Sequence, residues 1–257
     1  FDLCAARPEP IPFFGELGSI NPVFVMPEAL AQRGAELGTA WAGSLTMGVG
    51  QFCTNPGVVV IPEGEAVTTF TEAAAKALAD VGESVMLTEG IAEAYRRGVA
   101  EVAGKDGVQE LLRGTCDRRK AAPAIYKVSA EDWLANEALS EEVFGPFGIV
   151  VTTSGPEQML EVARNLKGQL TVTLQMDDAD MEVAKRFVPV LERKAGRVLV
   201  NGFPTGVEVA DAMVHGGPYP ASTNFGATSV GTMAIRRFLR PVCYQNMPNQ
   251  LLLKDLV

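Results

Sequence analysis

One cysteine in a turn of small residues is the feature of this sequence best suited to chemistry. Cys53 lies in the segment GQFCTNPG (residues 50–57), directly before an apolar run at residues 58–61 that is typical of a strand. A thiol held in a tight loop, with backbone N–H groups nearby to receive an oxyanion, has what attack on a carbonyl requires. The competing interpretation is structural, since a cysteine is more often a small buried hydrophobe than a nucleophile.

Two acidic motifs supply further candidates. Glu16 lies between Phe14 and Leu17 after an apolar run, so burial is expected to raise its pKa toward the range of a general base. Its alternative is a solvent-facing side chain at a strand end. Glu142 belongs to the segment EEVFGP (residues 141–146), for which composition alone favours a charged helix end followed by a loop.

The single histidine is the remaining candidate base. His215 lies in VHGGP (residues 214–218), far along the chain from Cys53, and a cysteine protease using it as base stays possible. We expect instead a loop histidine bonded to its neighbours. The four cysteines are scattered and form no recognisable zinc pattern with one histidine, so no metal is expected.

Alternating helical and strand-like segments must position these residues. Helices are expected at residues 27–47, 66–81, 88–102, 156–166, 178–193 and 229–239, and strands at 58–61, 124–128, 149–153, 170–175, 197–201 and 242–246. Such β-α-β units predict an α/β fold with a parallel sheet covered by helices. Cys53 then follows the C-terminal end of a helix, where the dipole disfavours a thiolate, so other groups must activate it.

Composition narrows the class of partner. The chain has 257 residues, of which 47% are hydrophobic, which is enough for a sizeable core. Its formal charge of -9 and its lack of a Lys/Arg cluster argue against nucleic acid or an anionic membrane as partner. No apolar run approaches the roughly 18 residues of a membrane span. We therefore expect a small-molecule partner and a cytoplasmic protein with reduced thiols.

Taken in order, three motifs resemble those of the aldehyde dehydrogenase superfamily. They are Glu-Leu-Gly at residues 16–18, Cys53, and Glu-x-Phe-Gly-Pro at residues 142–146. The resemblance covers nearly the whole chain, which corresponds to the C-terminal half of such an enzyme. It implies the three-layer, open, mostly parallel sheet of the aldehyde dehydrogenase catalytic domain.

The resemblance also implies a role for each motif. Cys53 would form a thiohemiacetal with the aldehyde and then a thioester, and Glu16 would activate the hydrolytic water. Glu142 would hold the nicotinamide ribose and Phe144 would pack near the nicotinamide of NADP or NAD. The substrate pocket would be lined by Phe52 and Asn201.

Two segments narrow the resemblance to one branch of the superfamily. GELGSINP (residues 15–22) and HGGPYP (residues 215–220) look like the branch of 2-oxoglutarate semialdehyde (2,5-dioxovalerate) dehydrogenases and NADP-dependent fatty aldehyde dehydrogenases. This branch implies an aldehyde substrate that is a semialdehyde, such as 2-oxoglutarate semialdehyde.

The start of the chain is short for this family, whose dinucleotide-binding domain precedes the Glu-Leu-Gly motif. We therefore expect a fragment, inactive alone, in which residues 1–22 are a remnant of the cofactor domain. Residues 23–228 would form the catalytic domain and residues 229–257 a C-terminal helix and oligomerisation arm, which serves a homo-oligomer in the full-length enzyme. The alternatives are a non-catalytic assembly module and a cofactor-free thiol esterase.

Overall fold

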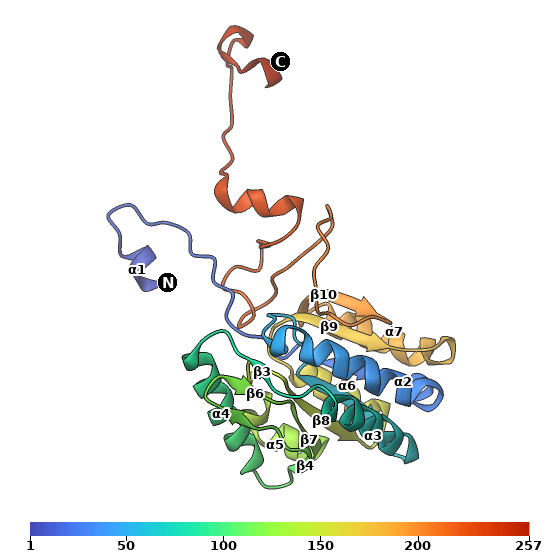
Figure 1. Cartoon of the computed structure of the whole chain (residues 1–257). Helices are drawn as coiled ribbons and strands as arrows, with labels where there is room; N and C mark the ends of the chain where they lie inside the picture. The colour runs from blue at the N-terminus through green and yellow to red at the C-terminus, as the bar shows by residue number, and fades with distance from the viewer. Residues whose placement is uncertain (257) are drawn as a thin grey trace.

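A seven-stranded sheet runs through the body of the computed structural model, which describes residues 1–256 (Figure 1). Its strand order is β10-β9-β1-β2-β8-β7-β4, and all neighbours are parallel except β4 and β7. The strands are β1 (Val23–Val25), β2 (Val58–Pro62), β4 (Gln109–Leu112), β7 (Ala124–Ser129), β8 (Phe147–Thr153), β9 (Gln169–Gln175) and β10 (Ala195–Val200). The predicted α/β fold with a mostly parallel sheet is confirmed.

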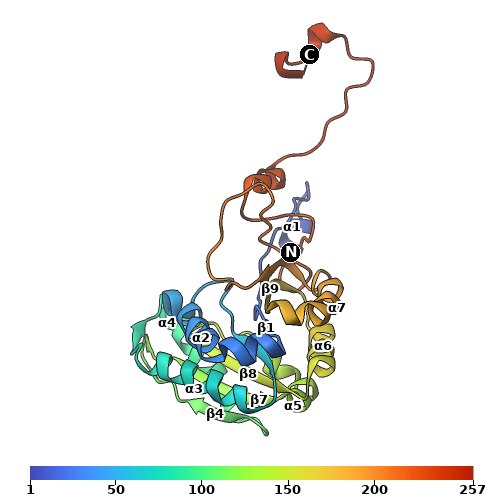
Figure 2. The same ribbon diagram turned by 90° about the vertical axis from the view of Figure 1, so that its right-hand side faces the viewer.

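Helices cover both faces of the sheet, which gives the molecule three layers (Figures 1 and 2). On one face α2 (Pro27–Thr46) packs against α3 (Glu65–Ala79), where the ring of Trp41 stacks on Phe70 at 5.8 Å between centroids. A second buried cluster, on the other face, includes residues of four helices: α4 (Glu89–Ala103), α5 (Ala130–Ala135), α6 (Pro156–Asn165) and α7 (Met181–Leu191). Because both faces are covered, the central strands read as unbroken apolar runs.

Some elements were not predicted from sequence. β1 and β4 are short, and a separate antiparallel sheet joins β3 (Ser84–Val85), β6 (Lys120–Ala121) and β5 (Cys116–Asp117). Strands of two or three residues are too short to show a period of two, so no sequence pattern marks them.

Both ends of the chain project from this body (Figure 1). The first residues form α1 (Asp2–Ala5), and the predicted helix at residues 229–239 is instead a 3-10 helix over Thr232–Phe238. That segment has no buried residue, so no packing stabilises a longer α-helix. Residues 242–246, which the structure describes, form no strand, so the strand predicted there is absent from the single chain. No neighbouring strand within residues 1–256 lies beside them to share backbone hydrogen bonds.

The loops that matter for function gather at one edge of the sheet. They are the segments that enter β1, β2, β8 and β9, so they lie at the amino ends of these parallel strands. Open α/β sheets more often bind ligands at the carboxyl ends. Within residues 1–256 no helix combines the length and apolar composition that crossing a membrane requires.

Candidate active site

The loop that carries Cys53 is packed against the loop that enters β8. Gly50 has φ +64°, and a Cβ on it would lie 2.2 Å from the backbone of Gly145. Only glycine permits both this conformation and this approach. Asn55 Nδ2 donates to the carbonyl oxygen of Gly145 at 3.1 Å, so the two loops are held together on each side of Cys53.

A network of buried hydrogen bonds also holds the loop that carries Cys53. Asn21 Nδ2 donates to the carbonyl oxygens of Cys53 at 2.9 Å and of Asn55 at 3.0 Å. Ser19 Oγ and the backbone N–H of Ile20 each lie 2.9 Å from the accepting oxygen of Gln169. Because these groups are buried and bonded to one another, they fix the position of Cys53 relative to β1 and β9.

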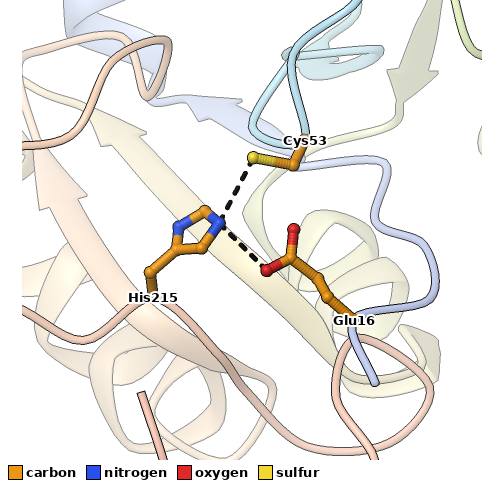
Figure 3. Close-up of side chains that lie close together, drawn as sticks. All are labelled: Glu16, Cys53 and His215. Atoms are coloured by element: carbon orange, nitrogen blue, oxygen red, sulfur yellow. Dashed lines mark hydrogen bonds and ion pairs between the residues drawn. The ribbon is translucent and has the colours of Figure 1, made fainter. Parts of the chain in front are cut away.

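Three side chains from three distant segments meet at the centre of the site (Figure 3). His215 Nε2 lies 3.2 Å from Cys53 Sγ and 3.2 Å from Glu16 Oε2. The imidazole is 5% exposed, whereas Cys53 is half-buried and opens to a cavity. We refer to Glu16, Cys53 and His215 as the Cys53 cluster.

The backbone on both sides of the imidazole is fixed by local hydrogen bonds. The N–H of His215 donates to Thr228 Oγ1 at 2.8 Å, and its carbonyl oxygen accepts from the N–H of Ser229 at 2.8 Å. Ser229 Oγ also donates to Glu16 Oε2 at 3.4 Å. The backbone of His215 is therefore bonded to its neighbours as expected, whereas its ring contacts Cys53 and Glu16.

The contacts within the Cys53 cluster shift two pKa values in opposite directions. Hydrogen bonds to Cys53 and then to Glu16 raise the pKa of His215 to about 9, against the effect of burial. The hydrogen bond from His215 lowers the pKa of Glu16, and this outweighs burial. The expectation that burial raises the pKa of Glu16 is thus wrong, because the sequence does not reveal its cationic partner.

Such an arrangement can activate a thiol. An imidazole that contacts a thiol on one side and a carboxylate on the other has the nucleophile, base and orienting group of a nucleophilic site. His215 and Glu16 are therefore the candidates for the groups that activate Cys53.

A cavity of about 310 Å³ opens beside the Cys53 cluster. Its wall includes Glu142 and Phe144, and a Cβ on Gly18 would lie 3.1 Å from Glu142 Oε2. The side chain of Glu142 is exposed, yet the protein around its carboxylate reduces solvation enough to raise its pKa to about 7, helped by the charge of Glu16. The N–H of Ser19 acts in the opposite direction.

A larger cavity of about 700 Å³ shares Gly18, Ser19 and Glu142 with the first. Lys167 and Tyr219 line its outer part. The two cavities are therefore neighbours, with Glu142 in the wall of both.

Comparison with known proteins decides the family. Residues 5–241 match the aldehyde dehydrogenase family. An alpha-ketoglutaric semialdehyde dehydrogenase 2 from Azospirillum brasilense is 53% identical over 253 residues, which are 98% of this chain and 48% of that protein. The chain belongs to the aldehyde dehydrogenase family.

Solved aldehyde dehydrogenases share the fold. A methylmalonate-semialdehyde dehydrogenase from Oceanimonas doudoroffii superposes with a TM-score of 0.73 at 18% identity, over 88% of this chain and 47% of that one. A glyceraldehyde-3-phosphate dehydrogenase from Methanocaldococcus jannaschii, solved with NADP, gives 0.63 at 23% identity, over 80% and 44%. The chain spans about half the length of the curated relatives it matches.

The two residues expected in the substrate pocket of this aldehyde dehydrogenase chain lie outside the cavity wall. Asn201 follows β10, and its Oδ1 accepts from the N–H of Met176 at 2.8 Å and from Arg33 at 3.5 Å. The ring of Phe52 lies against Gly48 and is 36% exposed. Glu16, Cys53, Glu142 and Phe144 do line the cavity together.

Sequence reasoning kept a pairing of His215 with Cys53 only as an alternative, and it missed the supporting role of Asn21. The signal for His215 was available, because it is the one histidine of the chain and lies in the HGGPYP segment that marks the branch. Asn21 lies in the other branch-specific segment, where φ of +46° aims it at the Cys53 loop. Such a backbone conformation leaves no trace in hydrophobic periodicity.

Proposed function

We propose that this chain is the catalytic half of a cytoplasmic NAD(P)-dependent dehydrogenase that oxidises a semialdehyde, such as 2-oxoglutarate semialdehyde, to a carboxylate. The observation that carries the proposal is the convergence of the Cys53 cluster with Glu142 and Phe144 around one cavity. The name of the Azospirillum brasilense relative supports the choice of substrate.

Cys53 is the nucleophile of the proposed reaction. His215 Nε2, at 3.2 Å from the sulfur, is the group that carries the proton released by the thiol, and Sγ adds to the aldehyde carbon to form a thiohemiacetal. Glu16 orients the imidazole and offsets its positive charge. Expulsion of a hydride from the thiohemiacetal carbon leaves a thioester on Cys53.

Hydrolysis of the thioester needs a base for the attacking water. Glu16 carries an ionised carboxylate at the cavity wall, so it accepts a proton from water as the acyl–sulfur bond breaks. The carboxylate product leaves and the Cys53 thiol is restored. Ser229 Oγ, at 3.4 Å from Glu16 Oε2, holds the carboxylate in place.

The residues that line the two cavities fit a dinucleotide. Glu142 extends its carboxylate across Gly18, where any side chain would fill the space, and Phe144 offers an apolar ring beside Cys53. Glu142 would accept hydrogen bonds from the ribose hydroxyls, and Phe144 would pack on the nicotinamide. A nicotinamide held there would supply the acceptor for the hydride.

The rest of the site is proposed to come from the other half of a longer protein that assembles as a homo-oligomer. The test uses this chain alone and together with the N-terminal half of the Azospirillum brasilense relative. We expect NAD(P)H formation from 2-oxoglutarate semialdehyde only in the combined sample, and none with Cys53→Ala. Activity of the Cys53→Ala variant, or a combined sample that binds nucleotide without turnover, would contradict the proposal.

The geometry of the Cys53 cluster also favours a second activity, nucleotide-independent hydrolysis of activated esters. Cys53 Sγ adds to the ester carbonyl, the alcohol leaves with a proton from His215, and water then releases the acid. Turnover of p-nitrophenyl acetate by the isolated chain tests this. Loss of turnover in Cys53→Ala is expected, whereas equal turnover would assign the activity to other groups.

A further inference from the structure

The Cys53 cluster has the donor atoms of a metal site as well as those of a nucleophile. Cys53 Sγ, His215 Nε2 and Glu16 Oε2 all lie within 4.8 Å of one another. Two of the separations, from Nε2 to Sγ and from Nε2 to Oε2, are 3.2 Å. One thiolate, one imidazole and one carboxylate are three protein ligands, each of a different type.

These separations match the size of a tetrahedral zinc site. Zinc binds sulfur at about 2.3 Å, imidazole nitrogen at about 2.0–2.1 Å and carboxylate oxygen at about 2.0–2.2 Å. Tetrahedral ligands at such lengths lie roughly 3.3–3.6 Å apart, so the two contacts of Nε2 need shifts of a few tenths of an ångström, and the sulfur and the carboxylate oxygen must close to that range from a separation within 4.8 Å. The 310 Å³ cavity beside Cys53 leaves the fourth position open to water.

The surroundings of the donors are rigid on the nitrogen and oxygen sides. Both backbone polar groups of His215 are bonded, to Thr228 and Ser229, and Ser229 Oγ also contacts the Glu16 carboxylate. Fixed outer partners of this kind orient ligands toward a metal. The ligands come from residues 16, 53 and 215, which is why no zinc pattern appears in the sequence.

The donor set selects the class of cation. Thiolate and imidazole prefer Zn²⁺, Co²⁺ or Cd²⁺, whereas Mg²⁺ and Ca²⁺ prefer sites made of oxygen atoms.

We propose that Glu16, Cys53 and His215 form a reversible binding site for Zn²⁺, which caps the Cys53 sulfur and blocks its reaction with carbonyl compounds. Zinc replaces the thiol proton, which passes to solvent, and no electron transfer is involved. The site would make the activity of Cys53 sensitive to free zinc. Because binding is measured directly, this inference stands or falls separately from the dehydrogenase reaction.

Cobalt is the probe, since a cobalt–thiolate bond gives a near-ultraviolet charge-transfer band. The tag-free chain, reduced with a phosphine, is titrated with Co²⁺, and Zn²⁺ is then added in competition. We expect one cobalt per chain, intense visible bands of tetrahedral geometry, and their loss on addition of Zn²⁺. A band that Zn²⁺ does not displace, or no band at all, overturns the proposal.

Variants assign the ligands. Cys53→Ser should abolish the charge-transfer band, and His215→Gln should weaken cobalt binding by more than the roughly 10–100-fold expected for loss of an outer partner. Cys116→Ser and Cys243→Ser are the matched controls and should bind cobalt like the parent chain. A band that persists in Cys53→Ser, or unchanged affinity in His215→Gln, contradicts the assignment.

A second readout on the parent chain does not depend on folding of the variants. Zn²⁺ should protect Cys53 from iodoacetamide while Cys243 is alkylated at its usual rate, and EDTA should restore labelling of Cys53. Mg²⁺ should protect neither thiol. Equal protection of Cys53 and Cys243 would show general binding of zinc to thiols and would refute a defined site.

Discussion

The two sides of the cavity beside Cys53 differ in how well their polar groups are bonded within this chain. On one side, the side chains of the Cys53 cluster bond to one another, with the imidazole between the sulfur and the carboxylate. Thr228 and Ser229 form hydrogen bonds with the backbone of His215. On the other side, Glu142 is exposed, and the surrounding protein disfavours its charged form. The contacts of Cys53 are made within the fold, whereas the carboxylate of Glu142, on the proposed nucleotide side, has no such partner side chain among the contacts described.

The contacts that position Cys53, the proposed nucleophile, all come from this chain. The loops at the amino ends of β1 and β2 are tied together by Asn21, and the Cys53 loop is tied to the β8 loop by Asn55. All of these contacts lie within residues 1–256. The preorganisation of the thiol therefore depends on this chain, and the proposed oxidation depends on the rest of the protein.

The largest expected effect comes from removing the imidazole. His215→Gln should slow alkylation of Cys53 at neutral pH on the order of tenfold or more, because the variant lacks the imidazole that lies 3.2 Å from the sulfur and can hold the thiol proton. Glu16→Gln should give a smaller loss, since the histidine remains. Mass spectrometry after brief iodoacetamide treatment, with EDTA present, measures both. An unchanged rate in His215→Gln would separate the imidazole from the reactivity of the thiol.

The contact between the two loops can be broken at a glycine. Gly50→Ala should lower the free energy of unfolding by about 2–4 kcal/mol, through left-handed strain and overlap with Gly145. Gly43→Ala is the matched control, because Gly43 is exposed in α2 with nothing within 4 Å of an added Cβ.

The control should raise the free energy of unfolding by about 0.5–1 kcal/mol, since alanine is the better helix former. Urea unfolding of the two variants beside the parent chain gives both values. If Gly50→Ala unfolded at the same urea concentration as the parent, the loops would be independent of each other.

Ionisation of Glu142 should lower the stability of the folded chain as the pH rises. Its folded pKa of about 7 lies above the ordinary 4.5, so the folded state loses stability as pH rises from 4.5 to 7 and gains nothing back above 7. Glu142→Gln should therefore match the parent chain near pH 4.5 and melt at a higher temperature at pH 8. The exposed Glu93→Gln serves as control, and equal melting of parent and Glu142→Gln at pH 8 would contradict the assignment.

The smallest effect on stability is expected at the C-terminal end. A chain ending at Arg240 lacks Val242 and Tyr244, which are exposed, so its urea midpoint should not change. Its self-association in sedimentation should fall if the segment is the predicted oligomerisation arm. Unchanged association would refute that role, and a lower midpoint would show that the segment packs on the body.

The sequence predicted the body of the fold better than its ends. β2 and β8 are buried on both faces, so their apolar runs are unambiguous, and α3 and α4 follow clear helical spacing. The segment at residues 229–239 has no fully buried residue in its helical part, and it forms only a 3-10 helix. Local pattern predicts structure only where tertiary packing supports it.

For the site, the sequence predicted candidate residues but not their electrostatics. Burial was expected to raise the pKa of Glu16 toward the range of a general base, yet the hydrogen bond from His215 lowers it. The sign of such a shift depends on a contact between segments about 200 positions apart, which no spacing rule contains. Asn201 was predicted to line the substrate pocket. Its Oδ1 accepts a hydrogen bond from the N–H of Met176, in the loop after β9.

The central claim is that Cys53 is activated within this chain, and its rank among the thiols tests that most directly. Cys243 is exposed and Cys53 is only partly so, so accessibility alone predicts that Cys243 reacts first. Substoichiometric iodoacetamide followed by peptide mapping of the isolated chain gives the ratio of the two rates. We predict faster labelling of Cys53, and faster or equal labelling of Cys243 would contradict the claim.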